Sequence, residues 1–277
     1  MAKDKTLKGR IPKELEDMTL LDRFLFSEAI EDKETMELML GIILGEEVEL
    51  KEKPQAEKEE RTSPGSKRVV LDVLGEDIND ILYNIESQKE FRRNLPKRSR
   101  YYEGIITIKR LKSGETDYGK VQDVCMIMVM PFDLFGKGSY KYTFQMSCDE
   151  FPDVKLEDGA TRIFLNTRGT DPEAASEELI ALLKYIENTT DEVAESSGNQ
   201  KIMRIHEKIK AIKANEDVGV RLMNAWEEKQ ETLKEGLEIG SYEKQLEIAK
   251  RMKAREMNLQ EIADITGLPE EEIKKLS

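Results

Sequence analysis

The amino-acid sequence predicts an α/β fold, in which a mixed central sheet is flanked by helices and followed by an all-helical C-terminal appendage. Runs rich in β-branched and aliphatic residues, which are typical of strands, lie between residues 68 and 166. Apolar residues at helical spacing come before and after these runs. Beyond residue 200 the chain is rich in Glu and Lys and has no strand-like run. A length of 277 residues suits one large domain with an appendage.

The N-terminal part of the chain contains two predicted helices and a long connection. Residues 19–44 carry apolar side chains at helical spacing, with a break at residues 31–32 and Gly45 as a stop signal. Residues 46–67 are rich in Glu, Lys and Pro and are expected to be irregular. Residues 1–18 are charged and weakly apolar, and we expect them to form a flexible arm.

A hairpin, a helix and further strands follow. Residues 68–77 and 81–91 flank the turn signal Asn79-Asp80, which predicts a β-hairpin. A helix is expected over residues 96–112, with Pro96 near its start, despite a β-branched run in its second half. Three more strands are expected at residues 121–130, 140–146 and 161–166.

The rest of the chain is predicted to be helical. Residues 173–187 form an amphipathic helix that closes an α/β domain at residues 19–190. Residues 191–200 have the composition of a linker. Residues 201–277 are expected to form a helical region that ends in a small helix-turn-helix-like pair. This region could pack on the domain or build a homo-oligomer.

Composition and charge exclude several classes of protein. The formal net charge of −13 should repel phosphate-rich partners unless basic residues are concentrated locally. No apolar run reaches the ~18–20 residues of a membrane span, and no secretory segment follows the charged N-terminus, so we expect a cytoplasmic protein with no membrane partner. Cys125 and Cys148 are then reduced thiols, and Cys125 is expected in the core. The single histidine, His206, is expected at the surface, which excludes most histidine-based catalysis.

Two carboxylates and an amide stand in the predicted hairpin. Asp72 is flanked by aliphatic residues, and Glu86 and Gln88 alternate along the partner strand, so that they share one face. A turn near residues 79–80 places Asp72 roughly opposite Glu86–Gln88, with the register open by one residue, and a slip of one residue would change the face. Carboxylate and amide oxygens suit Mg²⁺ or Mn²⁺. From spacing alone, solvated or salt-bridged carboxylates are the more common interpretation of such a pattern.

The string LDVLGED-INDI-LYNIESQKE, together with RSRYY, the N-terminal LLDRFLFSEAIED and the late IFLNTRG, resembles a known family. It is similar to the PD-(D/E)XK nuclease superfamily, and more closely to the Rpn family of recombination-promoting nucleases, often labelled transposases. The resemblance covers about residues 20–187. It implies a restriction-endonuclease-like fold for residues 19–190 and a metal-dependent DNA endonuclease linked to recombination or mobile elements.

The resemblance also implies roles for single residues. Asp72 and Glu86 correspond to the two metal-binding acids, with Mg²⁺ as the expected cofactor and Mn²⁺ as an alternative. Gln88 stands where the superfamily usually has a lysine, and because an amide supplies no positive charge, Arg98 or Arg100 is a candidate substitute. A further acid usually comes from the first helix, and we favour Asp22 over Glu28; both could equally be surface charges.

Residues 89–112 are the basic stretch of the chain, with nine Lys and Arg residues against Glu90 and Glu103. Next to the acidic pair, such a stretch could hold a DNA backbone, or it could be a salt-bridged helix face. The expected DNA-phosphate contacts are Arg93, Lys97, Arg98, Arg100 and Tyr102. The alternative function is a catalytically inactive module of the same fold that binds DNA or another protein.

Overall fold

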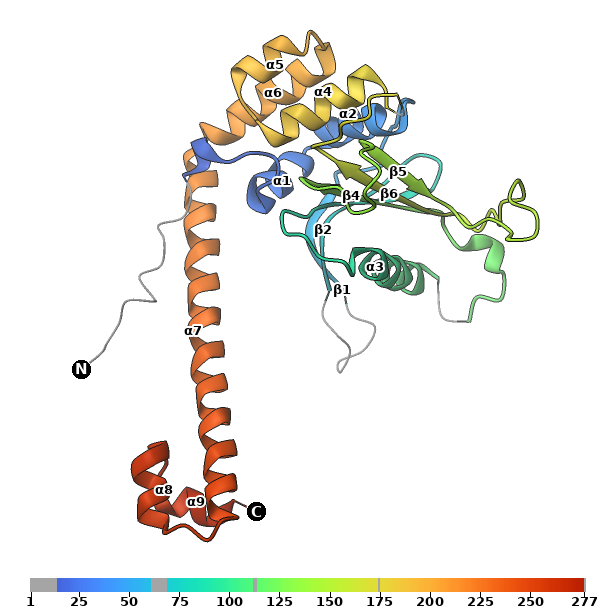
Figure 1. The fold of residues 1–277 in the computed structure, drawn as a ribbon. Helices are drawn as coiled ribbons and strands as arrows, with labels where there is room; N and C mark the ends of the chain where they lie inside the picture. The colour runs from blue at the N-terminus through green and yellow to red at the C-terminus, as the bar shows by residue number, and fades with distance from the viewer. Residues whose placement is uncertain (1–13, 61–68, 112–113, 174, 277) are drawn as a thin grey trace. The chain divides into compact units, whose positions relative to one another are not determined.

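The computed structural model describes residues 14–60, 69–111, 114–173 and 175–276 (Figure 1). The chain divides into two compact units, one spanning Lys13–Val218 and the other containing Gly219–Ser277. The first unit holds the sheet and all the helices that pack on it. In the described residues, no helix combines the length and the apolar character that crossing a membrane requires.

A six-stranded mixed sheet forms the centre of the first unit, with the order β1-β2-β3-β4-β6-β5. Strands β3, β4 and β6 run parallel to one another, whereas β1–β2, β2–β3 and β5–β6 are antiparallel pairs. The central β4 is buried along its whole length, as its continuous apolar sequence predicts. The strands are β1 (Gln55–Glu60), β2 (Val69–Glu76), β3 (Leu82–Ser87), β4 (Val124–Met130), β5 (Lys141–Phe144) and β6 (Ala160–Asn166).

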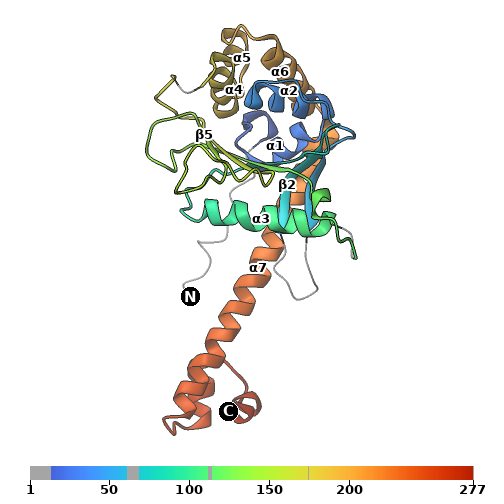
Figure 2. The same cartoon turned by 90° about the vertical axis from the view of Figure 1, so that its right-hand side faces the viewer.

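Helices cover both faces of this sheet (Figures 1 and 2). One helix, α3, lies along one face, and the other helices of the unit lie over the opposite face. This arrangement confirms the predicted restriction-endonuclease-like α/β class. The helices of the unit are α1 (Arg23–Ile30), α2 (Lys33–Leu44), α3 (Leu95–Arg110), α4 (Glu177–Glu187), α5 (Asp191–Ser196) and α6 (Gln200–Lys213), with short 3₁₀ turns at Leu15–Asp17 and Tyr118–Lys120.

The helix α3 adopts its predicted position because its apolar face finds a partner. Ile105 and Ile106 pack against buried residues of β2, β3 and β4. Burial of this face outweighs the lower helix propensity of β-branched residues. The predicted hairpin is also present: the carboxylate of Asp77 accepts hydrogen bonds from the amides of Asn79 and Ile81, which closes the turn between β2 and β3.

The second unit is helical, as expected. Helix α7 (Glu216–Lys253) crosses the division between the units and is followed by α8 (Leu259–Thr266) and α9 (Glu270–Lys275). Ala249, Ile262, Leu268 and Ile273 form a small buried core between these elements. Gly267 ends α8 in the left-handed conformation that favours glycine. A homo-oligomer through these helices stays a prediction.

The strand β1 corrects the expectation of an irregular segment at residues 46–67. Its sequence, QAEKEE, has none of the apolar alternation that marks a strand, but its backbone pairs with β2 at the edge of the sheet. Charged residues are common on edge strands because they discourage pairing with other chains. Residues 61–67 of the expected connection lie outside the described residues.

Three further boundaries differ from the sequence-based expectation. The second hairpin strand ends at Ser87 and not at residue 91. Helix α4 begins at Glu177, because the Ser176 side chain accepts a hydrogen bond from the amide of Leu179 and so caps it. The segment expected as a linker, 191–200, contains the helix α5.

The described part of the expected N-terminal arm is packed. Leu15 and Met18 are buried, and the amide of Leu20 donates to the Thr189 hydroxyl at 2.9 Å. Apolar side chains at two of five positions suffice to anchor this short segment. Residues 1–13 of the arm lie outside the described residues.

His206 is buried, which corrects its expected surface position. Its Nδ1 lies 2.8 Å from the Tyr185 hydroxyl, and its Nε2 lies 3.0 Å from Asp191 Oδ1. Burial raises the pKa of Tyr185, so that its hydroxyl stays protonated. His206 of α6 thereby contacts Tyr185 of α4 on one side and Asp191, the first residue of α5, on the other.

We expect Tyr185→Phe to destabilise the protein by ~1–2 kcal/mol, because it leaves the buried His206 Nδ1 without that partner. Urea denaturation followed by circular dichroism measures the change. The matched control is Tyr118→Phe at an exposed position, which should stay within ~0.5 kcal/mol of the natural chain. Equal stability of both variants would show that the His206 contact contributes nothing.

Candidate active site

The predicted carboxylate pair lies at a fork between two strands. Pairing of β2 with β3 stops at Val73 and Ile85. Before this point in the chain, β2 pairs with β1 alone; beyond it, β3 continues along β4, where the amide of Gln88 donates to the carbonyl of Val129. Asp72 and Glu86 are the next two residues in the hairpin register, so the structure settles a register that the sequence left open by one residue.

At the fork, side chains replace the missing backbone hydrogen bonds. The amide of Asp72 donates to Glu86 Oε1 at 2.9 Å, and the amide of Ser87 donates to Asp72 Oδ2 at 3.2 Å. Each carboxylate therefore satisfies an amide of the other strand, which buried backbone groups require. Both carboxylates are buried, with side chains 2 % and 0 % exposed.

One guanidinium pairs with each carboxylate. Arg98 Nη2 of α3 lies 3.1 Å from Glu86 Oε2, and Arg23 Nε of α1 lies 2.8 Å from Asp72 Oδ1. The positive charges offset the cost of burying two carboxylates side by side. Asn84 adds a hydrogen bond from its Nδ2 to Glu86 Oε1 at 3.2 Å.

Glu86 of this pair has a strongly raised pKa. Burial first, and the nearby Asp72 charge second, raise the pKa of Glu86 to about 7, against the opposing effects of the Asp72 amide and Arg98. A carboxyl that titrates near neutral pH can take up or release its proton under mild conditions. Such groups are concentrated at functional sites.

Arg98 is the cation that the sequence left undecided. Its Nη1 donates to Gln88 Oε1 at 2.7 Å and its Nε to the Tyr102 hydroxyl at 2.7 Å, with the guanidinium 4.9 Å from the Tyr102 ring centre. Arg100, two residues further along, points to nearly the opposite side of the helix and is exposed. Gln88 and Arg98 thus form one hydrogen-bonded unit beside Glu86.

The first helix also reaches this region. Asp22 is the residue just before α1, and its side chain makes no capping hydrogen bond to the helix. Its Oδ2 accepts from the amide of Thr19, and its Oδ1 accepts from Lys89 Nζ at 2.7 Å. The Ser87 hydroxyl donates to the carbonyl of Leu21 at 3.0 Å, which ties the start of α1 to the end of β3. The alternative acid, Glu28, lies half-buried further along α1.

Comparison with models of protein families shows which family has this sequence. The model of the PD-(D/E)XK nuclease family transposases matches residues 20–237. The chain belongs to this family. The match confirms the resemblance and extends it past residue 187, through α5, α6 and part of α7. No curated protein and no solved structure is significantly similar to the chain.

The donor set of this family member suits a hard divalent cation. Two buried carboxylates and the amide oxygen of Gln88 offer the oxygen ligands that Mg²⁺ and Mn²⁺ prefer. The buried Asn84 Oδ1 has no hydrogen-bond partner in the described part of the chain. Within that part, no three His, Cys, Asp or Glu side chains gather as a metal-holding group, so Asp22 does not complete a triad with Asp72 and Glu86 in this structure.

The other basic residues expected to contact phosphate lie on the surface at the start of α3. Arg93 precedes α3, and Lys97 and Arg100 lie in its first turns; all three are exposed. Tyr102 contacts Arg98 and the apolar cluster beneath α3. Sequence reasoning missed Arg23, Asn84 and Ser87 as members of the site. Only Asn84 carried a signal, because it alternates with Glu86 and Gln88 on the same face of β3.

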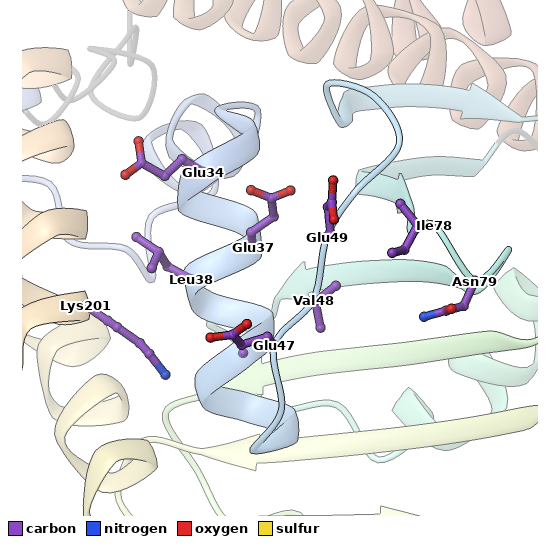
Figure 3. Close-up of a pocket in the computed structure, with 10 residues that line it drawn as sticks. Glu34, Glu37, Leu38, Glu47, Val48, Glu49, Ile78, Asn79 and Lys201 are labelled. Carbon is purple, nitrogen blue, oxygen red and sulfur yellow. The ribbon is translucent and has the colours of Figure 1, made fainter.

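A separate pocket of about 430 Å³ lies away from the fork (Figure 3). Glutamates from α2 and the segment after it line it, together with the β2–β3 turn and Lys201 of α6. Its acidic lining disfavours a phosphate ligand. The pocket lining consists of Glu34, Glu37, Leu38, Gly41, Glu47, Val48, Glu49, Ile78, Asn79 and Lys201.

The shifted carboxyl predicts a pH-dependent stability. The folded chain holds the Glu86 proton up to about pH 7, whereas the unfolded chain releases it near 4.5. The Glu86 contribution to the free energy of unfolding therefore falls as pH rises between these values, by at most ~3.5 kcal/mol at ~1.4 kcal/mol per pKa unit. In metal-free buffer, Glu86→Gln should melt at a higher temperature than the natural chain at pH 8 and show little difference at pH 4.5.

The control for this prediction is Glu192→Gln, which removes an exposed carboxylate. Its melting temperature should follow the natural chain across the pH range. If the melting temperature of Glu86→Gln also equals that of the natural chain at pH 8, the pKa of Glu86 is not raised in the folded protein.

Proposed function

We propose that this chain is a metal-dependent DNA endonuclease that hydrolyses phosphodiester bonds, in a setting of recombination or mobile elements. The observation that carries the proposal is the pair of buried carboxylates at the strand fork, next to a fixed guanidinium, in a member of a nuclease family. The setting rests on the family description alone.

In this proposal Asp72 and Glu86 hold the cation, which is Mg²⁺ or Mn²⁺. A bound divalent cation supplies Lewis-acid polarisation of a phosphate oxygen and lowers the pKa of a water molecule. The two carboxylates come from the adjacent strands β2 and β3 and would hold the cation there, with their orientation fixed by the hydrogen bonds from the backbone amides. Asp22 is a candidate for an outer position, through its place at the start of α1.

Arg98 takes the place of the usual lysine. A guanidinium stays protonated and can bind two phosphate oxygens at once, so it stabilises negative charge but relays no proton. Gln88 and Tyr102 orient it through hydrogen bonds to Nη1 and Nε. We therefore assign Tyr102 an orienting role in place of a direct phosphate contact.

The DNA backbone would approach along the exposed basic residues. Arg93, Lys97 and Arg100 lie at the start of α3, in the segment that follows the strand carrying Glu86. Phosphate contacts from such residues set the position of DNA without reading its sequence. They also give affinity that falls steeply with salt, which suits a chain whose overall charge is −13.

A second candidate function is a catalytically inactive module that binds DNA or protein. Two observations favour it: an amide in place of the lysine, and a guanidinium on each carboxylate. Titration of supercoiled plasmid with Mg²⁺ and Mn²⁺ separates the two functions. Binding without nicking at any metal concentration supports the inactive module and contradicts the endonuclease.

Asp72→Ala and Glu86→Ala should each reduce metal-dependent plasmid cleavage by ~100-fold or more, because metal catalysis is worth several kcal/mol and each ~1.4 kcal/mol is tenfold in rate. Circular dichroism checks that both variants fold. Glu192→Ala, at an exposed position of α5, is the control and should cleave as the natural chain does. Undiminished cleavage in both site variants would refute the assignment.

Two arginines of α3 should behave differently. Arg98→Met should slow cleavage at saturating DNA, because it removes the charge beside Glu86. Arg100→Met should leave the saturated rate nearly unchanged and reduce the slope of log affinity against log salt by about one. Single-turnover cleavage and a binding titration at several salt concentrations give both values; similar effects of the two substitutions would contradict the placement of Arg98.

A further inference from the structure

The two guanidiniums at the fork differ in their exposure to solvent. Arg98 is fixed by Glu86, Gln88 and Tyr102, and 27 % of its side chain is exposed. Arg23 approaches Asp72 from the first turn of α1, and 49 % of its side chain is exposed. One cation is thus built into the site, and the other reaches in from its edge.

The backbone that carries Arg23 is firmly anchored. The amide of Leu20 donates to Thr189, the carbonyl of Leu21 accepts from Ser87, and Asp22 binds Lys89. A change at Arg23 therefore involves its side-chain rotamers and leaves α1 in place. Half-exposed arginine side chains change rotamer on a fast timescale.

Arg23 occupies an oxygen that a metal ion would need. Asp72 Oδ2 accepts the amide of Ser87, so Oδ1, which faces Arg23 Nε at 2.8 Å, is the oxygen directed away from the hairpin backbone. A guanidinium and a divalent cation on the same carboxylate repel each other. A divalent cation at the fork would therefore bring positive charge beside Arg23, which is already paired with Asp72.

We propose that Arg23 stands in for the metal ion in the metal-free protein and transfers to the DNA phosphate when the metal binds. This inference rests on the proposed nuclease function and concerns a residue that function does not use. The displaced guanidinium remains near the fork, because α1 is anchored, and a phosphodiester is the anion that the substrate brings there. Arg23 would thus couple metal binding to substrate binding.

The test compares Mn²⁺ affinity in the absence of DNA, which depends on no cleavage. Arg23→Met keeps the aliphatic stem and removes the competing charge, so we expect it to bind Mn²⁺ about tenfold more tightly than the natural chain in calorimetric titrations. Arg23→Lys, which retains a cation, should fall between the two. Arg204→Met is the matched control, since Arg204 is similarly exposed and carboxylate-paired on α6, and it should leave Mn²⁺ affinity unchanged.

The second half of the proposal is tested with duplex DNA in Ca²⁺. Arg23→Met should reduce the slope of log affinity against log salt by about one, whereas Arg204→Met should not. An unaltered slope overturns the transfer to phosphate.

The outcomes separate this inference from the proposed function. If the natural chain and Arg23→Met bind Mn²⁺ equally, or the variant binds it more weakly, Arg23 does not compete with the metal and the inference is wrong, while the metal site stands. If neither binds Mn²⁺ although circular dichroism shows both folded, the metal site itself is refuted, and the inference with it.

Discussion

The carboxylates of Asp72 and Glu86 are buried side by side between β2, β3 and α3. The structure around them supplies hydrogen bonds and positive charges that offset the cost of this burial. Isolated buried carboxylates cost far more than a small domain can offset. Here each carboxylate accepts a backbone amide from the opposite strand and faces one guanidinium. The strand fork supplies the amides, α3 supplies Arg98, and α1 supplies Arg23. The site therefore depends on elements from three separate segments of the chain.

Burying the two carboxylates side by side lowers the stability of the metal-free protein at neutral pH. The pKa of Glu86 is raised because burial and Asp72 both disfavour its charge. A divalent cation would relieve the same repulsion, so the features that make the metal-free protein less stable are those that favour metal binding. Stability and function are commonly in conflict at active sites for this reason.

The hairpin and its acids could be predicted because their information is local. The Asn79-Asp80 turn and the alternation of Glu86 with Gln88 place Asp72 opposite Glu86–Gln88 to within one residue. The pairing with Glu86 itself is set by the longer turn that Asp77 closes. The choice between Arg98 and Arg100 could not be made, because it depends on how α3 rotates on the sheet. Arg23 was missed because its partner lies far away in the sequence, and nothing in α1 itself indicates the contact.

The errors at β1 and His206 have separate physical causes. Strand β1 is polar because it lies at an edge, where pairing depends on the backbone and not on buried side chains. His206 falls on the same face of α6 as Ile202 and Ile209, so its burial could have been read from helical periodicity. His206 was expected at the surface because charged residues surround it in the sequence.

The central claim is that the strand fork is a divalent metal site, and crystals of the protein grown with Mn²⁺ test it most directly. Anomalous scattering locates the ion without reference to activity. The account predicts a peak in contact with the carboxylates of both Asp72 and Glu86, with the Arg23 guanidinium moved off Asp72. Crystals saturated with Mn²⁺ that show no peak at this pair, and Arg23 still on Asp72, would contradict it.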